Sequence, residues 1–348
     1  MKFLDISRDF TFKGDGGSVV TKRNFNLLSE LGTTDSFFIP IPSLKTRMLN
    51  FLYRQSYGAT SALNIKLREC LNREYDFVFF DGSIYGGYLK RVSDAGFKTI
   101  CFFHNVEKVY YEAKARHTKA VMDMMMVPYI THNERLSVGH ASYIITLNQR
   151  DSDDLLRFYG RKADLILPSS FPSLELKASD IKTPAYLLFV GTNFFANVEG
   201  VRFIIEKIAP QTIMPIKIVG NVNEAFKDAA LPDNVEMLGR VDDISSYYRN
   251  ASAVIAPIFS GSGLKTKTVE ALRFGKTVLG TSEAFEGIDI AHNPGIGAVC
   301  HSASDFVSAI RDLSPTAINK ASLSLFEKCY SDNAALSALR NFLDRIVQ

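Results

Sequence analysis

Residues 253–272 read AVIAPIFSGSGLKTKTVEAL. An apolar run of strand length leads through a Gly-Ser-Gly turn into a helical pattern, which Gly275 ends. A strand that passes through a tight turn into a helix is the repeating unit of parallel α/β sheets. The same alternation continues in both directions along the chain, and we therefore expect an α/β protein.

Two series of short apolar strands are predicted, each interleaved with helical stretches. The first lies at 2–6, 35–39, 76–80, 98–103, 143–146 and 164–167, and the second at 186–190, 216–219, 235–238, 253–256, 277–280 and 297–300. A polar segment containing prolines and serines separates the two series. The predicted organisation is an N-terminal domain at 1–170, a linker at 171–183, a second domain at 184–325, and a C-terminal helix in 326–348 that packs back on the first domain.

Composition excludes several function classes. The 348 residues exceed a single core, and 46% hydrophobic with 22% charged residues is an ordinary globular balance. A net charge of +3 does not indicate a nucleic-acid partner. No apolar run approaches the roughly 18 residues of a membrane span, and the N-terminus reads as a strand rather than a secretion signal. The four cysteines form no CxxC pair, so we expect a cytoplasmic protein without a structural metal or disulfides.

The turn at 261–263 is a candidate anion site, because backbone amides at a helix N-terminus suit a diphosphate. Lys265 and Lys267 follow in the first turn, where the helix dipole disfavours cations. That local conflict favours a ligand-binding role. Glu270 is three residues beyond Lys267, on the same helix face, and could accept hydrogen bonds from a ribose diol. The alternative is a surface helix with an ordinary ion pair.

The first half offers two weaker candidates. Residues 14–18 read GDGGS after the first strand, and the loop either binds phosphate or is a tight strand–helix turn. His104, followed by Asn105, comes directly after the strand at 98–103, and at the carboxyl end of a parallel strand it would point into the ligand crevice. A structural hydrogen-bonding role for His104 is the alternative.

The stretch from Lys45 to Arg73 interleaves basic residues with leucines and aromatics in a helical pattern. Such a surface could bind an anionic acceptor or the edge of a membrane. A solvated amphipathic helix explains the pattern equally well. Basic and aromatic residues also bind single-stranded RNA, but no RNA-binding motif accompanies these.

Three segments of the second half resemble one family. The run from Gly261 to Glu270, with Phe274-Gly275-Lys276 and Glu286-Gly287 after it, resembles the donor-binding segment of glycosyltransferase family 4. It is most similar to the bacterial polysaccharide-assembly branch, whose pattern is Gly-Ser-Gly-x-Arg/Lys-x-Lys-x-x-Glu. Residues 189–201 and 239–243 resemble two further segments of that branch, and the likeness spans about 186–290. In the first half it rests on residues 16–17, 104–107 and 146–148.

The resemblance implies a GT-B fold, with two Rossmann-like doubly wound domains facing across a cleft. It also implies a nucleoside-diphosphate sugar donor, a saccharide or lipid-linked saccharide acceptor, retention of anomeric configuration, and neither a metal nor a cofactor. Lys265 and Lys267 would then neutralise the departing diphosphate, and His104 would contact the donor sugar. The donor-binding positions implied are Gly16, Gly17, Gly191, Gly261, Ser262, Gly263, Leu264, Thr268 and Glu270.

The sequence departs from the family pattern at two positions. Ser262 stands where many members carry a glutamate, and Thr192 stands where some carry an arginine. Two alternatives to glycosyl transfer therefore remain open. A sugar-nucleotide epimerase also uses two facing Rossmann domains, and a non-catalytic nucleotide-sugar-binding or saccharide-binding subunit would tolerate the loss of the glutamate at position 262.

Overall fold

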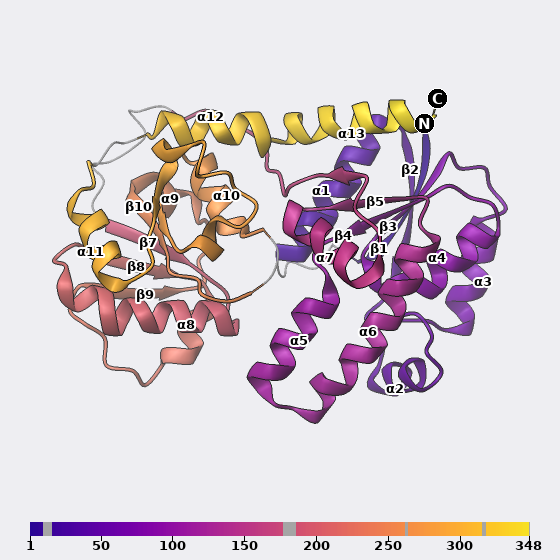
Figure 1. Cartoon of the computed structure of the whole chain (residues 1–348), viewed down its shortest axis with the longest axis horizontal. Coiled ribbons are helices and arrows are strands. Elements are labelled where there is room, and N and C mark those ends of the chain that lie inside the picture. The colour runs from indigo at the N-terminus through magenta and orange to yellow at the C-terminus, as the bar shows by residue number, and fades with distance from the viewer. Residues whose placement is uncertain (10–15, 177–185, 262–263, 315–317, 348) are drawn as a thin grey trace. The chain divides into compact units, whose positions relative to one another are not determined.

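The computed structural model describes residues 1–9, 16–176, 186–261, 264–314 and 318–347. The chain divides into two compact units. The first comprises Met1–Pro168 together with the C-terminal residues from Ala335, and the second comprises Ser169–Ala334. Each unit contains one six-stranded sheet (Figure 1).

The first sheet has the strand order β2-β1-β3-β4-β5-β6, and all its strands are parallel. Its strands are β1 (Lys2–Arg8), β2 (Thr33–Ile39), β3 (Phe77–Asp81), β4 (Thr99–Phe103), β5 (Tyr143–Thr146) and β6 (Leu165–Ile166). The central strands β3 and β4 read FVFFD and TICFF, and every residue in them is buried. Such continuous apolar runs fit a sheet that is covered on both faces. The chain order reverses between β1 and β3, and the carboxyl ends of strands at such a point are where open α/β sheets generally bind ligands.

The helices of the first unit are α1 (Gly16–Leu31), α2 (Leu44–Leu52), α3 (Ser61–Cys70), η1 (Ser83–Tyr85), α4 (Gly86–Asp94), α5 (Glu107–Thr118), α6 (Val121–His140) and α7 (Gln149–Tyr159). The hairpin of α5 and α6 extends away from the sheet, and α2 lies beside α6 (Figure 1). The C-terminal helix α13 (Asp332–Val347) contacts the first sheet, since the rings of Phe342 and Tyr143 lie 5.8 Å apart.

The prediction of one continuous helical stretch over 45–73 is wrong. The structure has two helices there, separated by residues 53–60. Arg54 has a φ of 49° and Gly58 a φ of 76°, and these left-handed conformations end the first helix and redirect the chain.

The second sheet has the order β12-β11-β10-β7-β8-β9, again entirely parallel. Its strands are β7 (Tyr186–Val190), β8 (Ile216–Val219), β9 (Val235–Gly239), β10 (Ala251–Ala256), β11 (Thr277–Gly280) and β12 (Gly297–Val299). Here the order reverses between β7 and β10. The loop at Gly191 and the loop that leads to α10 (Thr266–Arg273) therefore leave the sheet side by side at its switch point.

The remaining helices cover this sheet. They are α8 (Phe195–Phe203), which continues into η3 (Ile204–Ile208) and η4 (Ala209–Gln211), then η5 (Asn221–Phe226), α9 (Ser245–Asn250), η6 (Ser282–Phe285), η7 (Pro294–Ile296), α11 (Ala303–Arg311) and α12 (Lys320–Cys329). Glycine is required where α8 meets the loop after β10, because a Cβ at Gly200 would lie 2.5 Å from the carbonyl oxygen of Pro257. In the described parts of the chain, no helix combines the length and apolar character needed to cross a membrane.

Candidate functional site

The N-terminus of α10 brings the two predicted lysines together. Lys265 is the residue that caps α10, with extended backbone angles, and Lys267 is the second residue of the helix. Both side chains therefore lie at the positive end of the helix dipole, where a lysine disfavours helix formation and an anion is favoured. Thr268 anchors this turn, because its hydroxyl donates to the carbonyl oxygen of Ala284 at 2.7 Å.

Lys265 is held by a carboxylate. Its Nζ lies 2.6 Å from Oε1 of Glu283 in η6, and both side chains are largely buried. Gly261, at the start of the glycine turn, has a φ of +133°, which a residue with a Cβ rarely adopts. A Cβ there would come within 3.8 Å of the Lys265 ammonium. That distance is an ordinary van der Waals contact, so the positive φ and not a lack of space is what favours glycine at this position.

Lys267 lies against β7 and the first turn of α8. Its ammonium donates to Oδ1 of Asn197 and lies 4.5 Å from the centroid of the Phe189 ring. Gly191 leaves room for this contact, since a Cβ there would lie 2.7 Å from the Phe189 ring and 3.0 Å from Asn197. The pKa of Lys267 is lowered to about 7, because burial and the neighbouring charge of Lys265 lower it by more than Glu270 raises it. An anion at this position would restore the charged form.

Glu270 is also perturbed. The pKa of its carboxyl is raised to about 7, because burial outweighs the lowering effects of Arg273, Lys267 and a hydrogen bond from Tyr248. Tyr248 is itself fixed by stacking on Phe274, with the ring centroids 4.9 Å apart and the planes 2° from parallel. Lys267 and Glu270 therefore form a pair of partly buried, interacting ionisable groups on one face of α10, a combination typical of functional sites.

His104 has a defined partner in the first unit. Its Nε2 lies 2.9 Å from Oδ1 of Asp81, the last residue of β3, and Nδ2 of Asn24 donates to the same oxygen at 2.7 Å. Burial raises the pKa of Asp81, but His104 and the hydrogen bonds from its neighbours outweigh burial and lower it overall. Asp81 is fully ionised near neutral pH as a result, and it orients a His104 ring that keeps about 20% of its surface exposed.

A second carboxylate fixes the loop that follows His104. Glu134 of α6 is buried, and its oxygens accept hydrogen bonds from the backbone amides of Glu107 and Lys108 at 2.8 and 3.0 Å. The hydroxyls of Ser83 and Tyr159 complete the set at 3.0 and 2.7 Å. The N-terminus of α5 is thereby satisfied by a side chain from another helix. Residues 104–106 are held between the end of β4 and this fixed point.

The other predicted positions differ in how far the structure describes them. Gly16 and Gly17 begin α1 directly after the loop that follows β1. Leu264 and Thr268 are buried, so their side chains serve the core, and a ligand could reach only their backbone. Ser262 and Gly263 lie outside the described residues, as do residues 10–15 of the first glycine loop.

Sequence reasoning missed the partners of the predicted residues. Asp81 could have been identified from the sequence, because a carboxylate that ends a wholly apolar strand lies at the carboxyl edge of the sheet. Glu283 and Asn197 approach the lysines only through the packing of separate βα units, and Glu134 reaches α5 from the middle of another helix. Spacing along the chain does not reveal such pairings.

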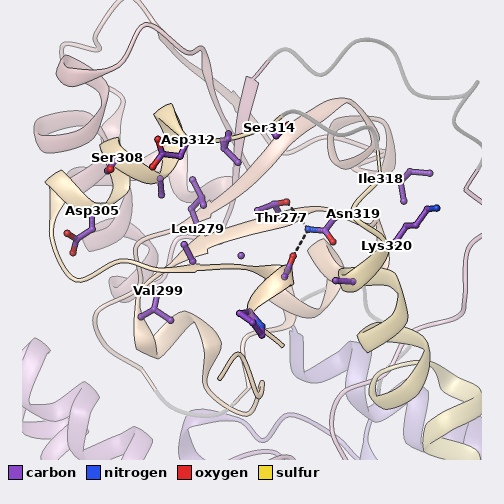
Figure 2. A pocket seen from close by; sticks show the side chains of 17 residues that line it. Thr277, Leu279, Val299, Asp305, Ser308, Asp312, Ser314, Ile318, Asn319 and Lys320 are labelled. Carbon is purple, nitrogen blue, oxygen red and sulfur yellow. Dashed lines mark hydrogen bonds between the residues drawn. The ribbon is translucent and has the colours of Figure 1, made fainter. Parts of the chain in front are cut away.

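Neither a metal cluster nor a cavity coincides with the residues predicted to form the site, within the part of the chain that the structure describes. Across the described ranges, no group of three or more His, Cys, Asp or Glu side chains is arranged to hold a metal ion. A cavity of about 920 Å³ lies beside β12, α11 and α12 (Figure 2). Asn319 crosses it and donates to Oγ1 of Thr277 at 3.0 Å. The cavity contains none of the predicted site residues and stands apart from the N-terminus of α10.

Two parallel six-stranded sheets, each with glycine-bordered loops at its switch point, define a protein of two Rossmann-like doubly wound domains. Residues 184–314 match the family model described as glycosyl transferases group 1. That range is the second unit's sheet and its helices up to α11.

Solved structures agree with this class along nearly the whole chain. The Anabaena protein HepE in complex with UDP has a TM-score of 0.68 at 14% identity, covering 99% of this chain and 100% of that one. WaaG, a glycosyltransferase involved in lipopolysaccharide biosynthesis, has a TM-score of 0.66 at 14% identity, covering 98% of both. The pneumococcal O-GlcNAc transferase GtfA, in complex with UDP and GlcNAc, has a TM-score of 0.68 at 9% identity, covering 100% and 99%. The expected GT-B fold is confirmed.

One curated relative is similar in sequence. It is an uncharacterized 44.6 kDa protein in the cps region of Klebsiella pneumoniae, 22% identical over 267 residues. The alignment covers 70% of this chain and 66% of the relative, just under two thirds of its length.

Proposed function

We propose that this chain transfers a sugar from a nucleoside-diphosphate sugar to a saccharide or lipid-linked saccharide acceptor during polysaccharide or glycan synthesis. The observation that carries the proposal is the pair Lys265 and Lys267 at the N-terminus of α10, beside the glycine turn and the loop at Gly191. The family match over 184–314 supports glycosyl transfer as the activity. Proteins of similar fold have been solved in complex with UDP, UDP-glucose or GlcNAc, and a donor of this class is compatible with those complexes.

In the proposed mechanism, the charge of the leaving diphosphate is stabilised by the protein. As the bond between the anomeric carbon and the diphosphate oxygen breaks, negative charge grows on that oxygen. The α10 amides and the ammoniums of Lys265 and Lys267 would meet it without reorganising, which is the usual source of large rate enhancements. Glu270 would accept hydrogen bonds from the ribose, and His104, oriented by Asp81, would contact the donor sugar.

Two finer features belong to the same proposal. The lysines and the helix terminus supply the positive charge that a divalent ion supplies elsewhere, so we propose a reaction that needs no metal. We propose retention of the anomeric configuration on the resemblance of residues 261–270 to retaining enzymes. We also propose that the protein works at the cytoplasmic face of a membrane and contacts it through the region Lys45–Arg73.

The test is turnover by the purified chain. A panel of nucleotide-sugars is incubated with lipid-linked and soluble saccharides, with and without EDTA, and release of nucleoside diphosphate is followed. We expect release from one donor, dependent on acceptor and unaffected by EDTA, and NMR of the product should show a retained anomer. A new nucleotide-sugar formed without acceptor would instead indicate an epimerase. Donor binding without turnover on any acceptor would indicate a non-catalytic subunit.

A further inference from the structure

The tip of the α5–α6 hairpin exposes consecutive apolar side chains. Val121 and Met122 are 67% and 59% exposed, and Met124 and Met125 are exposed as well. Exposed apolar residues scattered singly need no explanation, whereas four within five positions at the end of a projecting hairpin mark an interaction surface.

The apolar surface continues onto α2. Leu49, Leu52 and Tyr53 are exposed there. The two groups adjoin, because Val127 and Pro128 of α6 line one pocket together with Leu52 and another together with Met124. We call this surface, formed by residues 49–54 and 121–135, the α2–α6 face.

A cationic pocket lies within the α2–α6 face. It has a volume of about 570 Å³ and is lined by Arg54, His132 and Arg135 around an apolar wall that includes Phe51 and Pro128. No Asp or Glu is among its lining residues. Among the described residues, neither of the two arginines forms an ion pair with a carboxylate.

The positive charge in this pocket is not offset by its surroundings. Burial lowers the pKa of His132, and the charges of Arg54 and Arg135 lower it further, so this imidazole is neutral near neutral pH and the positive charge of the pocket comes from the two arginines. Arg54 is also held in a left-handed conformation with a φ of 49°, uncommon for a residue with a side chain. A strained residue that brings like charges together is a feature of ligand sites.

The surrounding surface has the same sign. Arg116 and Lys119 are exposed at the hairpin tip. Two carboxylates lie near the tip, and both are already paired. Glu112 pairs with Lys108, while Asp123 lies 2.8 Å from Nζ of Lys114 and accepts a hydrogen bond from the hydroxyl of Thr118 at 2.8 Å. The tip therefore combines an apolar surface with uncompensated positive charge. This is the pattern of segments that lie in the headgroup region of an anionic membrane.

We propose that the α2–α6 face docks on a membrane containing anionic phospholipid, with a lipid phosphate in the pocket of Arg54, His132 and Arg135 and the side chains of 121–125 among the headgroups and upper acyl chains. Of the region Lys45–Arg73 proposed above as the membrane contact, this docking surface keeps only residues 49–54. The basic residues of α3 have no part in it. Free phosphate would satisfy the pocket but would leave the apolar tip in water, which favours the lipid as the occupant.

The experiment is co-sedimentation of the full chain with vesicles, either of pure phosphatidylcholine or with roughly a quarter phosphatidylglycerol. We expect partitioning onto the anionic vesicles alone. Arg54→Gln with Arg135→Gln should lower that partitioning by about 30-fold, which corresponds to about 1 kcal/mol for each arginine. The matched control is Lys227→Gln with Arg311→Gln in the second unit, two exposed cations outside both the α2–α6 face and the region Lys45–Arg73, which should leave partitioning unchanged.

A second pair of variants separates the lipid from the free anion. Met122→Ser with Met125→Ser should weaken vesicle binding and leave binding of inorganic phosphate unaltered. Phosphate binding by a protein that no vesicle retains would overturn the lipid assignment. Equal losses from the control pair and from the pair Arg54 and Arg135 would overturn the pocket. Binding of a nucleoside diphosphate is measured in parallel on every variant. It shows whether the variant is folded and tests the proposed donor site, and it does not depend on the membrane result.

Discussion

The Nζ atom of Lys265 lies 2.6 Å from Oε1 of Glu283, so a predicted diphosphate-binding cation is paired with a carboxylate when no ligand is present. The pair is largely buried, and removing one partner leaves the other charge uncompensated. In the proposed donor site, a diphosphate would therefore compete with Glu283 for Lys265. This competition sets the resting affinity of the proposed donor site.

Glu283→Gln should tighten nucleoside-diphosphate binding. The amide retains an oxygen that accepts from Lys265 but removes the competing negative charge, so we expect an affinity gain of about 3- to 10-fold, or roughly 1 kcal/mol. Isothermal titration calorimetry measures the change. Glu236→Gln is the matched control, since Glu236 pairs with Lys217 at 3.1 Å on the sheet edge away from α10. Weaker binding by Glu283→Gln would mean that Glu283 positions Lys265 rather than competes for it.

Binding should depend on pH through Lys267. Its pKa of about 7 means that it loses its proton as the pH rises through neutrality, and the protonated form is the one that binds a diphosphate. Lys267→Arg carries a charge at all these values. The ratio of wild-type to Lys267→Arg affinity for pyrophosphate should therefore fall from about pH 6 to about pH 8. Because the ligand titrates identically in both experiments, a constant ratio would contradict the shifted pKa.

Lys267→Met should stabilise the protein while impairing its function. The pKa of Lys267 in the folded state, about 7, lies below its ordinary value of 10.5. The unfolded chain therefore binds a proton that the folded chain lacks between those values, and the lysine lowers stability increasingly as the pH falls toward about 7. We expect a melting temperature a few degrees higher at neutral pH, with diphosphate affinity reduced at least about tenfold. Lys217→Met, which replaces a more exposed lysine, should change neither quantity appreciably. A lower melting temperature for Lys267→Met would show that its contacts to Asn197 and Phe189 outweigh the cost of burial.

Asp81→Asn should affect catalysis without affecting diphosphate binding. Asparagine keeps the size of the side chain but removes the charge that holds His104. We expect kcat to fall by about 10- to 100-fold, whereas the dissociation constant for the nucleoside diphosphate should stay within about twofold. Steady-state kinetics beside calorimetry separates the two effects. Equal losses in both quantities would place Asp81 in general folding rather than in positioning His104.

The sequence predicts the two parallel sheets well because each strand is a short apolar run ended by turn residues. The sequence also predicts the cluster at the start of α10, since the glycine turn, the two lysines and Glu270 lie within ten consecutive positions. Contacts between side chains far apart in the sequence cannot be predicted from such local patterns. Glu283 meets Lys265 only because Thr268 anchors α10 to the carbonyl of Ala284 in the next βα unit.

The helical prediction over 45–73 failed for a local reason. The basic and aromatic residues keep a helical period across the whole stretch, but Gly58 and a left-handed Arg54 interrupt the backbone between α2 and α3. Periodicity records which side chains face the protein, and it does not record a change in chain direction. The cationic pocket of the α2–α6 face depends on that break and on a helix some 80 residues further along the chain.

The most direct measurement is calorimetric titration of nucleoside diphosphates into the wild type, Lys265→Ala and Lys267→Ala, each in EDTA. If the N-terminus of α10 is the donor site, the wild type binds one diphosphate selectively without metal. Each alanine variant should then lose at least about tenfold in affinity while remaining folded by circular dichroism. Unchanged affinity in both variants, or binding by the wild type only after a divalent ion is added, would contradict the account.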